Sequence, residues 1–288
     1  MTAGRDQIQE CLVSDNVRGK ERPCRTALCS AINGLACMTQ LRAVFWDVDG
    51  TLADTEMDGH RPAFNAAFDE LGLPIHWDPE LYSRLLAIPG GLRRVRTYLS
   101  ERDLSVSDET LLDLREIKRR HYLSRIQQGH VGWRPGVRRL LHALDKADVP
   151  QWIVTSSGYP SVMALLEAGA KDLPRFAGII TSDDVSEGKP SPAGYRLALQ
   201  RSGCPAADGL AVEDSGVGLE AARAAGLACL LTPSPWDTGL VSLLSQAAAA
   251  VNHLGDPSNP ATHLHGPPCS EGLVTLEYLQ DLISGTPR

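Results

Sequence analysis

The sequence predicts an α/β fold in which a parallel sheet lies between helices and carries a separate helical cap. From residue 42 onward, short apolar runs typical of strands alternate with amphipathic helical patterns. Between the first and second of these runs, residues 54–134 show helical patterns only. Ligands of open α/β sheets bind at the carboxyl ends of the strands. We therefore expect the inserted helices to cover that edge of the sheet.

The core elements follow from apolar runs that end in polar or glycine-containing turns. Helices are predicted over Pro135–Lys146, Tyr159–Ala168 and Ser191–Arg201. The stretch 255–268 contains several prolines and glycines, which favours a surface loop. The strand predictions are residues 43–48, 151–156, 177–182, 210–214, 228–232 and 248–253.

These elements divide the chain into a core, a cap and two terminal segments. The core is expected to comprise residues 40–53 and 135–255, and the cap residues 54–134. Residues 256–288 are expected to form a loop and a helix. Residues 1–39 lack sustained periodicity and are predicted to be a poorly ordered extension. This extension is either an organelle transit peptide or upstream sequence before a start at Met38.

Composition excludes several classes of protein. The 288 residues have 43% hydrophobic content and a net charge of -7 with interspersed signs, which gives no basic face for nucleic acid. No apolar run approaches the roughly 18 to 20 residues that a membrane span needs. The seven cysteines form no C-x-x-C pair, which favours a reducing compartment. A monomer is expected, in the cytoplasm of a bacterium or the plastid stroma of an alga or plant.

The stretch Val44–Glu56 ends an apolar run with two aspartates, Asp47 and Asp49. Side chains two residues apart on a strand point to the same face, so both carboxylates are expected to emerge together. Two converging carboxylates repel each other, and this cost is tolerated where a cation lies between them or a proton is shared. The pattern therefore indicates a metal site, a reaction, or both.

Other strand ends supply complementary groups. Thr155 and Ser156 follow the second predicted strand, Lys189 follows the third, and Glu213 and Asp214 end the fourth. Carboxylates provide the hard oxygen ligands that Mg²⁺ prefers, whereas hydroxyls and a lysine bind phosphoryl oxygens. Together these groups predict a magnesium-dependent site for phosphoryl transfer.

The motifs "DVDGTL", "IVTSS", "GKPSP" and "VEDS" occur in the order typical of the haloacid dehalogenase (HAD) superfamily of phosphohydrolases. The chain resembles this superfamily over residues 42–232, which implies a Rossmann-like core. The resemblance implies that Asp47 is the nucleophile that accepts the phosphoryl group. It implies that Asp49 protonates the leaving alcohol and then activates water.

The same resemblance assigns the remaining core residues. Mg²⁺ would be held by the Asp47 carboxylate, the Asp49 backbone carbonyl and Asp214, with Glu213 beside them. Thr155 and Lys189 would bind the transferring phosphate.

The cap carries a narrower resemblance in "TEMDGHRPAFN", "WDPELY" and "GGLRR". These segments are similar to the CbbY group, known as phosphatases of xylulose 1,5-bisphosphate, an inhibitor of Rubisco. This likeness implies a sugar bisphosphate as the small-molecule partner and a functional link to Rubisco without direct contact. Cap residues choose the substrate while core residues perform the chemistry. The predicted substrate-binding residues are Asp54, Glu56, Arg94, Ser156, Ser157 and Gly158.

Two alternatives remain open on the sequence. A sugar-phosphate mutase of the β-phosphoglucomutase type would share the core and return the phosphoryl group to substrate. A non-catalytic protein of the same fold would only bind a phosphorylated metabolite. Among other polar residues, His60 is predicted to pack at the hinge, and His263, His265 and Cys269 are predicted to be loop residues because their spacing matches no zinc pattern.

Overall fold

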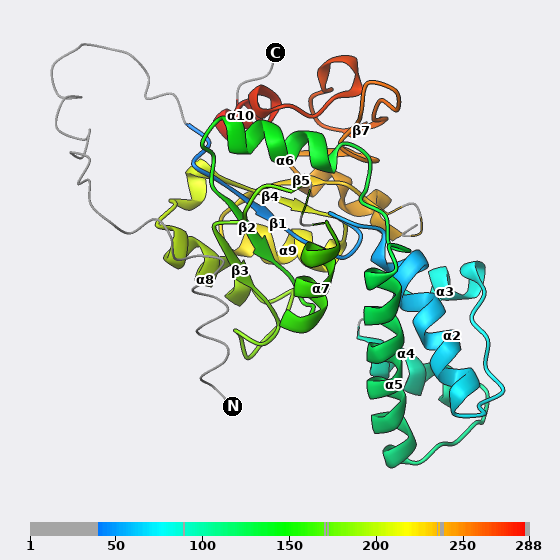
Figure 1. The fold of residues 1–288 in the computed structure, drawn as a ribbon. Coiled ribbons are helices and arrows are strands. Elements are labelled where there is room, and N and C mark those ends of the chain that lie inside the picture. The colour runs from blue at the N-terminus through cyan, green and yellow to red at the C-terminus, as the bar shows by residue number, and fades with distance from the viewer. Residues whose placement is uncertain are drawn as a thin grey trace, which may run out of the picture.

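The computed structural model describes residues 40–285 except 89, 170, 172, 235, 237 and 238, so the predicted extension lies outside the described residues. Its core is a seven-stranded sheet of order β3-β2-β1-β4-β5-β6-β7. The first six strands are parallel and β7 is antiparallel to β6 (Figure 1). The strands are β1 (Ala43–Trp46), β2 (Gln151–Val154), β3 (Gly178–Ile180), β4 (Gly209–Glu213), β5 (Ala228–Leu231), β6 (Ala249–Val251) and β7 (His263–His265).

β1 lies between β2 and β4 in the sheet and is apolar on both faces. All four of its residues are at most 1% exposed, as expected of a strand covered by helices on both sides. Trp46 is in register with Ile153 of β2 and with Val212 of β4. The residues that follow these three strands therefore start from the same edge of the sheet.

Helices cover both faces of the sheet (Figure 1). On one face, α6 (Val137–Lys146), α7 (Tyr159–Gly169) and α10 (Leu276–Ser284) contribute to one apolar cluster. On the other face, α8 (Ala193–Ser202) and α9 (Gly216–Ala224) contribute to a second cluster. Short 3-10 turns at 206–208, 239–246 and 270–272 complete the core. The predicted doubly covered α/β core is confirmed.

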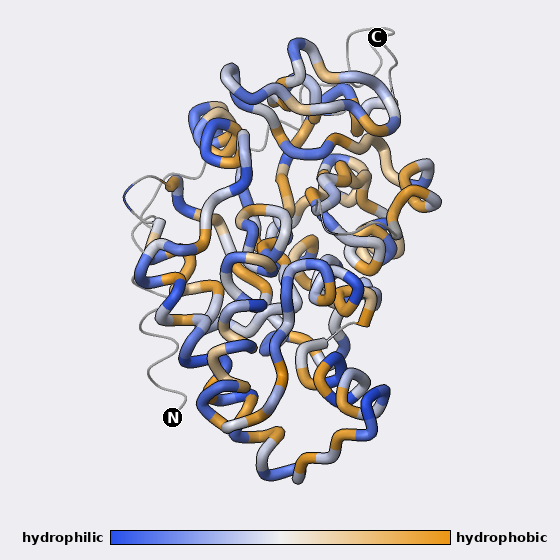
Figure 2. The backbone as a smooth tube through the Cα atoms, turned by 90° about the vertical axis from the view of Figure 1, so that its right-hand side faces the viewer, coloured by the Kyte–Doolittle hydropathy of each residue, from blue (hydrophilic) through white to orange (hydrophobic). Residues whose placement is uncertain are grey.

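Between β1 and α6 the named elements are all helical. They are a π-helical turn η2 (Glu56–His60), α2 (Arg61–Glu70), α3 (Pro79–Leu85), α4 (Gly91–Ser100) and α5 (Asp108–Gln127). Asp78 and Ser107 accept hydrogen bonds from the first turns of α3 and α5, which begins these helices. Trp77, Tyr82 and Phe68 are fully buried in an apolar cluster belonging to these helices. Figure 2 shows hydrophobic positions recurring between hydrophilic ones along the same helices.

The two connections between core and helical insertion lie side by side. Ala53, on the way out, forms an isolated bridge with Trp133, on the way back. The backbone N–H of Asp54 donates to Gly132 at 3.1 Å, and that of Arg134 donates to Leu52 at 2.9 Å. This pairing places the insertion directly above the loop that follows β1. None of the helices in the described part of the chain is long and apolar enough to cross a membrane.

Two sequence predictions need correction. Residues 263–265 were expected in a loop, but they form β7, because their backbone pairs with the free edge of β6 although the side chains carry no strand pattern. β1 ends at Trp46, so Asp47 and Asp49 lie in the following loop rather than on the strand. Strand alternation therefore does not place their two side chains.

Asn65 joins α2 to the loop before α3 through two buried hydrogen bonds. Its Oδ1 accepts from Trp77 N at 2.8 Å and its Nδ2 donates to Trp77 O at 2.9 Å. Asn65→Ala leaves Trp77 N–H unsatisfied and leaves Trp77 O with only the longer bond from Arg61 Nη1 at 3.3 Å, so we expect the free energy of unfolding to fall by about 2 kcal/mol. Urea unfolding followed by tryptophan fluorescence measures this. Asp113→Ala on the exposed side of α5 is the control, and an equal effect of both substitutions would contradict the prediction.

Candidate active site

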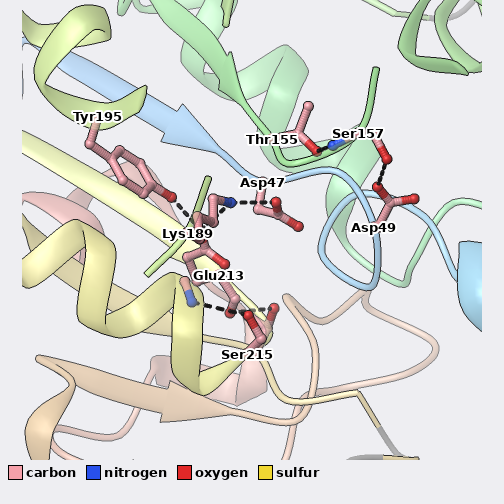
Figure 3. Close-up of polar contacts among 10 residues, drawn as sticks. Asp47, Asp49, Thr155, Ser157, Lys189, Tyr195, Glu213 and Ser215 are labelled. Carbon is pink, nitrogen blue, oxygen red and sulfur yellow. Dashed lines mark hydrogen bonds and ion pairs between the residues drawn. The ribbon is translucent and has the colours of Figure 1, made fainter. Parts of the chain in front are cut away.

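Asp47 and Lys189 form the centre of the site. Asp47 follows β1 directly, and its N–H continues the ladder by donating to Val212 O at 3.0 Å. Lys189 comes from the loop after β3, and its Nζ lies 2.5 Å from Asp47 Oδ1 (Figure 3). Each side chain is only 8% exposed. The structure thus brings together the two residues predicted to accept and bind the phosphoryl group.

Glu213, the last residue of β4, binds the other side of Lys189. Its Oε1 lies 2.6 Å from Lys189 Nζ, and its side chain is fully buried. Tyr195 on α8 donates its hydroxyl to the same oxygen (Figure 3). Burial by itself lowers the pKa of Lys189, but the charges of Asp47 and Glu213 outweigh it and raise that pKa. Tyr195 was not predicted, because its position on the helix after the lysine loop carries no motif.

Asp214 completes an acidic cluster with Asp47 and Glu213. One ligand oxygen from each residue lies within 4.8 Å of the others. Burial raises the pKa of Asp47 to about 7, and Glu213 and Asp49 add to this rise against the opposing charge of Lys189. Burial and the two neighbouring carboxylates also raise the pKa of Asp214 well above its ordinary range. Both burial and neighbouring negative charge therefore favour the protonated forms of Asp47 and Asp214.

The residues around this cluster fit a bound divalent cation. Glu213 Oε2 is buried without a hydrogen-bond partner, and hard carboxylate oxygens are the ligands that Mg²⁺ prefers. Gly50 has a φ of +84°, and a Cβ there would lie 1.9 Å from Asp214 Oδ2. Only glycine leaves room for this carboxylate. Of the predicted metal residues, Asp47, Glu213 and Asp214 belong to the cluster, whereas the Asp49 carboxylate does not.

The Asp49 carboxylate is held by residues of both core and insertion. Ser157, after β2, donates its hydroxyl to Asp49 Oδ2 (Figure 3), and Thr155 Oγ1 in turn accepts from Ser157 N at 3.1 Å. His60 Nε2 lies 3.5 Å from Asp49 Oδ1. Burial by itself raises the pKa of Asp49, but His60 and Ser157 together lower it below its usual range. Asp49 is therefore ionised in this arrangement.

Arg94 and Glu56 meet within the helical insertion. Tyr82 donates its hydroxyl to Glu56 Oε2 at 2.6 Å, and Arg94 Nη1 donates to that hydroxyl at 2.9 Å. Arg94 also donates to Leu85 O at 3.0 Å and is 6% exposed. Its predicted role in binding an anion stays a prediction, since its guanidinium has these internal partners. Tyr82 was missed, although its place in the "WDPELY" segment was noted.

Lys118 on α5 is a further cation that sequence reasoning missed. Its Nζ lies 2.9 Å from His60 Nδ1 and faces the rings of Phe64 and Tyr122 at 4.9 and 5.1 Å. Burial lowers the pKa of Lys118 to about 8, while Glu56 and Asp49 oppose this fall. His60, predicted only to pack at the hinge, stacks on Tyr122 and links Lys118 to Asp49.

The other predicted residues lie around the same edge of the sheet. Ser156 is exposed, and Gly158 precedes α7, where its carbonyl accepts from Ser161 N at 3.1 Å. Asp54 is half-buried in the connection to the insertion, where desolvation and Asp58 raise its pKa. Among the described residues, no hydrogen bond or ion pair links these three to the acidic cluster.

Comparisons with known proteins indicate the family to which this site belongs. Residues 41–226 match the family model of haloacid dehalogenase-like hydrolases. Protein CbbY of Cupriavidus necator is 40% identical over 253 residues, covering 85% of this chain and 98% of that protein. A CBBY-like protein of Arabidopsis thaliana is 33% identical over 80% of this chain and 73% of its own length.

Solved structures similar to this chain include members of the same CbbY group. CbbY from Rhodobacter sphaeroides in complex with phosphate has a TM-score of 0.63 and 34% identity, over 69% of this chain and 89% of that one. A mutant of the same protein in complex with xylulose-(1,5)bisphosphate has a TM-score of 0.62. These comparisons agree with the acidic cluster and its lysine. The chain belongs to the haloacid dehalogenase-like hydrolases, resembles their CbbY members, and is a hydrolase of phosphoric monoesters.

Proposed function

We propose that this protein is a magnesium-dependent sugar-bisphosphate phosphatase that works through an aspartyl-phosphate, with xylulose 1,5-bisphosphate as its preferred substrate. The contact of Lys189 with Asp47 carries the chemical part of the proposal. A carboxylate can attack a phosphate dianion only where positive charge offsets their repulsion. Lys189 provides that charge at the nucleophile, and Thr155 at the end of β2 provides a hydroxyl for a phosphoryl oxygen.

Asp49 serves as the acid and base of the reaction. The leaving alkoxide takes a proton from Asp49 as the bond from phosphorus to the sugar oxygen breaks, and the phosphoryl group is then bonded to Asp47. Asp49 next removes a proton from water, which attacks the phosphorus and releases phosphate and free Asp47. Ser157 and His60 hold the Asp49 carboxylate in its ionised form, which suits the second half of the cycle.

Asp47 and Asp214 would hold Mg²⁺, with the Asp49 backbone carbonyl as predicted and Glu213 beside them. The ion, when bound, supplies charge neutralisation for the transferring phosphoryl oxygens. Glu213 has a different role from the two aspartates, because its Oε1 already contacts Lys189 and Tyr195. It orients the lysine toward Asp47 and keeps it protonated.

The substrate proposal rests on charged residues of the helical insertion. Lys118 and Arg94 provide positive charge there, and Glu56 provides a carboxylate that can accept sugar hydroxyls. A related protein, 34% identical, has been solved in complex with xylulose-(1,5)bisphosphate. By hydrolysing this substrate, the protein would remove an inhibitor of Rubisco. We expect it to act as a monomer. No direct contact with Rubisco is implied.

Asp47→Asn should reduce phosphate release by about 10³-fold or more, because an amide cannot form the acyl-phosphate. Substrate binding should persist, since the amide keeps the size of the carboxylate and removes its repulsion of phosphate. Phosphate release and calorimetric titration with xylulose 1,5-bisphosphate measure the two effects. Asp113→Asn is the matched control, and undiminished turnover in Asp47→Asn would sink the nucleophile assignment and favour another mechanism.

Removal of divalent cations with EDTA should lower phosphate release by about 10²-fold or more, since the neutralising charge at the phosphoryl group is lost. Added Mg²⁺ should restore it. Ca²⁺ is the control ion, because its larger radius and higher coordination number distort a site built for octahedral Mg²⁺. Full activity in EDTA would contradict a metal-dependent mechanism.

Lys118→Met should weaken the use of a bisphosphate more than that of a monophosphate, because it removes a buried positive charge beside Asp49 and Glu56. We expect kcat/KM for xylulose 1,5-bisphosphate to fall about 10²-fold, with a smaller loss for β-glucose 1-phosphate. Lys146→Met, at the exposed end of α6, is the control. Equal losses of kcat/KM for both substrates would show that Lys118 does not bind the second phosphate.

The substrate panel also separates the mutase from the phosphatase. Wild-type protein is assayed with xylulose 1,5-bisphosphate, ribulose 1,5-bisphosphate, fructose 1,6-bisphosphate and β-glucose 1-phosphate. A mutase converts the last to glucose 6-phosphate and releases little free phosphate, whereas our proposal requires release of phosphate from the first. A non-catalytic binding protein would release none from any of them.

A further inference from the structure

Arg134 is a buried arginine at the point where the chain returns from the helical insertion to the core. It is 8% exposed, and its guanidinium donates only to neutral oxygens of three separate loops. Nη1 donates to Gly50 O, to Thr232 O at 2.6 Å and to Thr232 Oγ1 at 3.2 Å. Nη2 donates to Pro233 O at 3.0 Å and to Asn252 O at 2.6 Å.

This arrangement differs from an ordinary buried ion pair. Among the described residues, no carboxylate lies within salt-bridge distance of Arg134, although Asp214 and Asp54 act on it through space. A buried charge without a paired charge is costly unless its hydrogen bonds are satisfied. Five acceptor contacts satisfy the guanidinium fork here, and they come from the loops after β1, β5 and β6. The arginine therefore fixes these loops relative to one another.

Two of the loops that Arg134 joins adjoin the acidic cluster. The Gly50 backbone lies directly against the Asp214 carboxylate, since a Cβ at Gly50 would be 1.9 Å from Oδ2. Thr232 holds the backbone of Glu213, because its N–H donates to the main-chain carbonyl oxygen of Glu213 at 2.6 Å and its hydroxyl donates to the same oxygen at 3.3 Å. Moving either loop would change the spacing of the carboxylates.

We propose that Arg134 is a positioning residue for the cation site within the acidic cluster of Asp47, Glu213 and Asp214. By holding Gly50 and Thr232 it sets the separation of these carboxylates, although it touches neither the metal nor the substrate. This inference rests on the proposed function, because it presupposes that the cluster binds Mg²⁺. Groups that orient metal ligands typically change metal affinity about 10–100-fold when they are removed.

The position of Arg134 also makes competing explanations testable, because they predict different signs. A purely electrostatic role would oppose Mg²⁺ through charge repulsion, so removing the charge would tighten binding. A purely structural role would lower the melting temperature without changing Mg²⁺ affinity. A positioning role requires weaker Mg²⁺ binding in two cases: when the charge of Arg134 is removed, and when the charge is kept on a side chain of different shape.

The experiment compares Arg134→Gln and Arg134→Lys with wild type by calorimetric titration of Mg²⁺ into the full chain. Arg139→Gln is the matched control, because Arg139 on α6 also donates to backbone carbonyls, those of Leu254 and Gly255 at 2.7–3.0 Å. Its partners are not in the loops that adjoin the acidic cluster. The rise in melting temperature on adding Mg²⁺ provides a second readout that does not depend on activity.

We expect the Mg²⁺ dissociation constant to rise about tenfold in both Arg134 variants and to stay within about twofold of wild type in Arg139→Gln. Tighter binding in Arg134→Gln with wild-type binding in Arg134→Lys would overturn the proposal in favour of an electrostatic role. Unchanged affinity in both, with lowered melting temperatures, would overturn it in favour of a structural role.

Thr232→Val tests the same inference should the Arg134 variants not fold. It keeps the shape of the buried side chain and removes one acceptor of Arg134 together with one donor to Glu213. We expect a rise of about threefold in the Mg²⁺ dissociation constant, and unchanged affinity would overturn the proposal. Wild-type protein that neither binds Mg²⁺ nor releases phosphate would instead refute the proposed function, so the two failures are distinguishable.

Discussion

The ion pairs of Lys189 with Asp47 and Glu213 are the interaction on which the rest of the site depends. Both carboxylates are almost fully buried, and a buried charge without a partner is strongly destabilising. β1 and β4 are neighbours in the sheet, so the residues at their ends are forced together. One lysine cannot neutralise these two acids and Asp214 as well. Burial and the remaining negative charge raise the pKa of Asp47 and Asp214, and the divalent cation that we propose would offset this charge.

Asp49 has a different environment although it lies only two residues from Asp47. It lies outside the acidic cluster and is bound by Ser157 from the core and by His60 from the start of the helical insertion. Its ionised state therefore depends on both parts of the protein. A displacement of the insertion that withdrew His60 would raise the pKa of Asp49 and favour the protonated form, which the first step of the proposed mechanism requires. The position of the helical insertion and the protonation state of Asp49 are thus linked.

The sequence allowed the core site to be predicted because strand ends of a parallel sheet converge whatever the details of packing. Asp47, Thr155, Lys189, Glu213 and Asp214 all follow that rule. It could not reveal Lys118, Tyr82 or Arg134, because their roles arise from how helices of the insertion pack over that edge and how the chain returns from it. β7 was missed for a related reason, since its pairing depends on the free edge of β6 and not on its own side chains.

The arrangement of charges in the helical insertion constrains how a sugar bisphosphate can bind. Arg94 is committed to Tyr82 and Leu85, and its charge faces Glu56 at 3.8 Å. A phosphate placed beside Glu56 would meet a carboxylate, so this end of the site suits hydroxyl groups better than a second anion. Lys118 has a depressed pKa of about 8 because it is buried, and an approaching dianion would raise that pKa by favouring the charged form. The second phosphate of the proposed substrate is therefore better matched to Lys118 than to Arg94, and its sugar hydroxyls are better matched to Glu56.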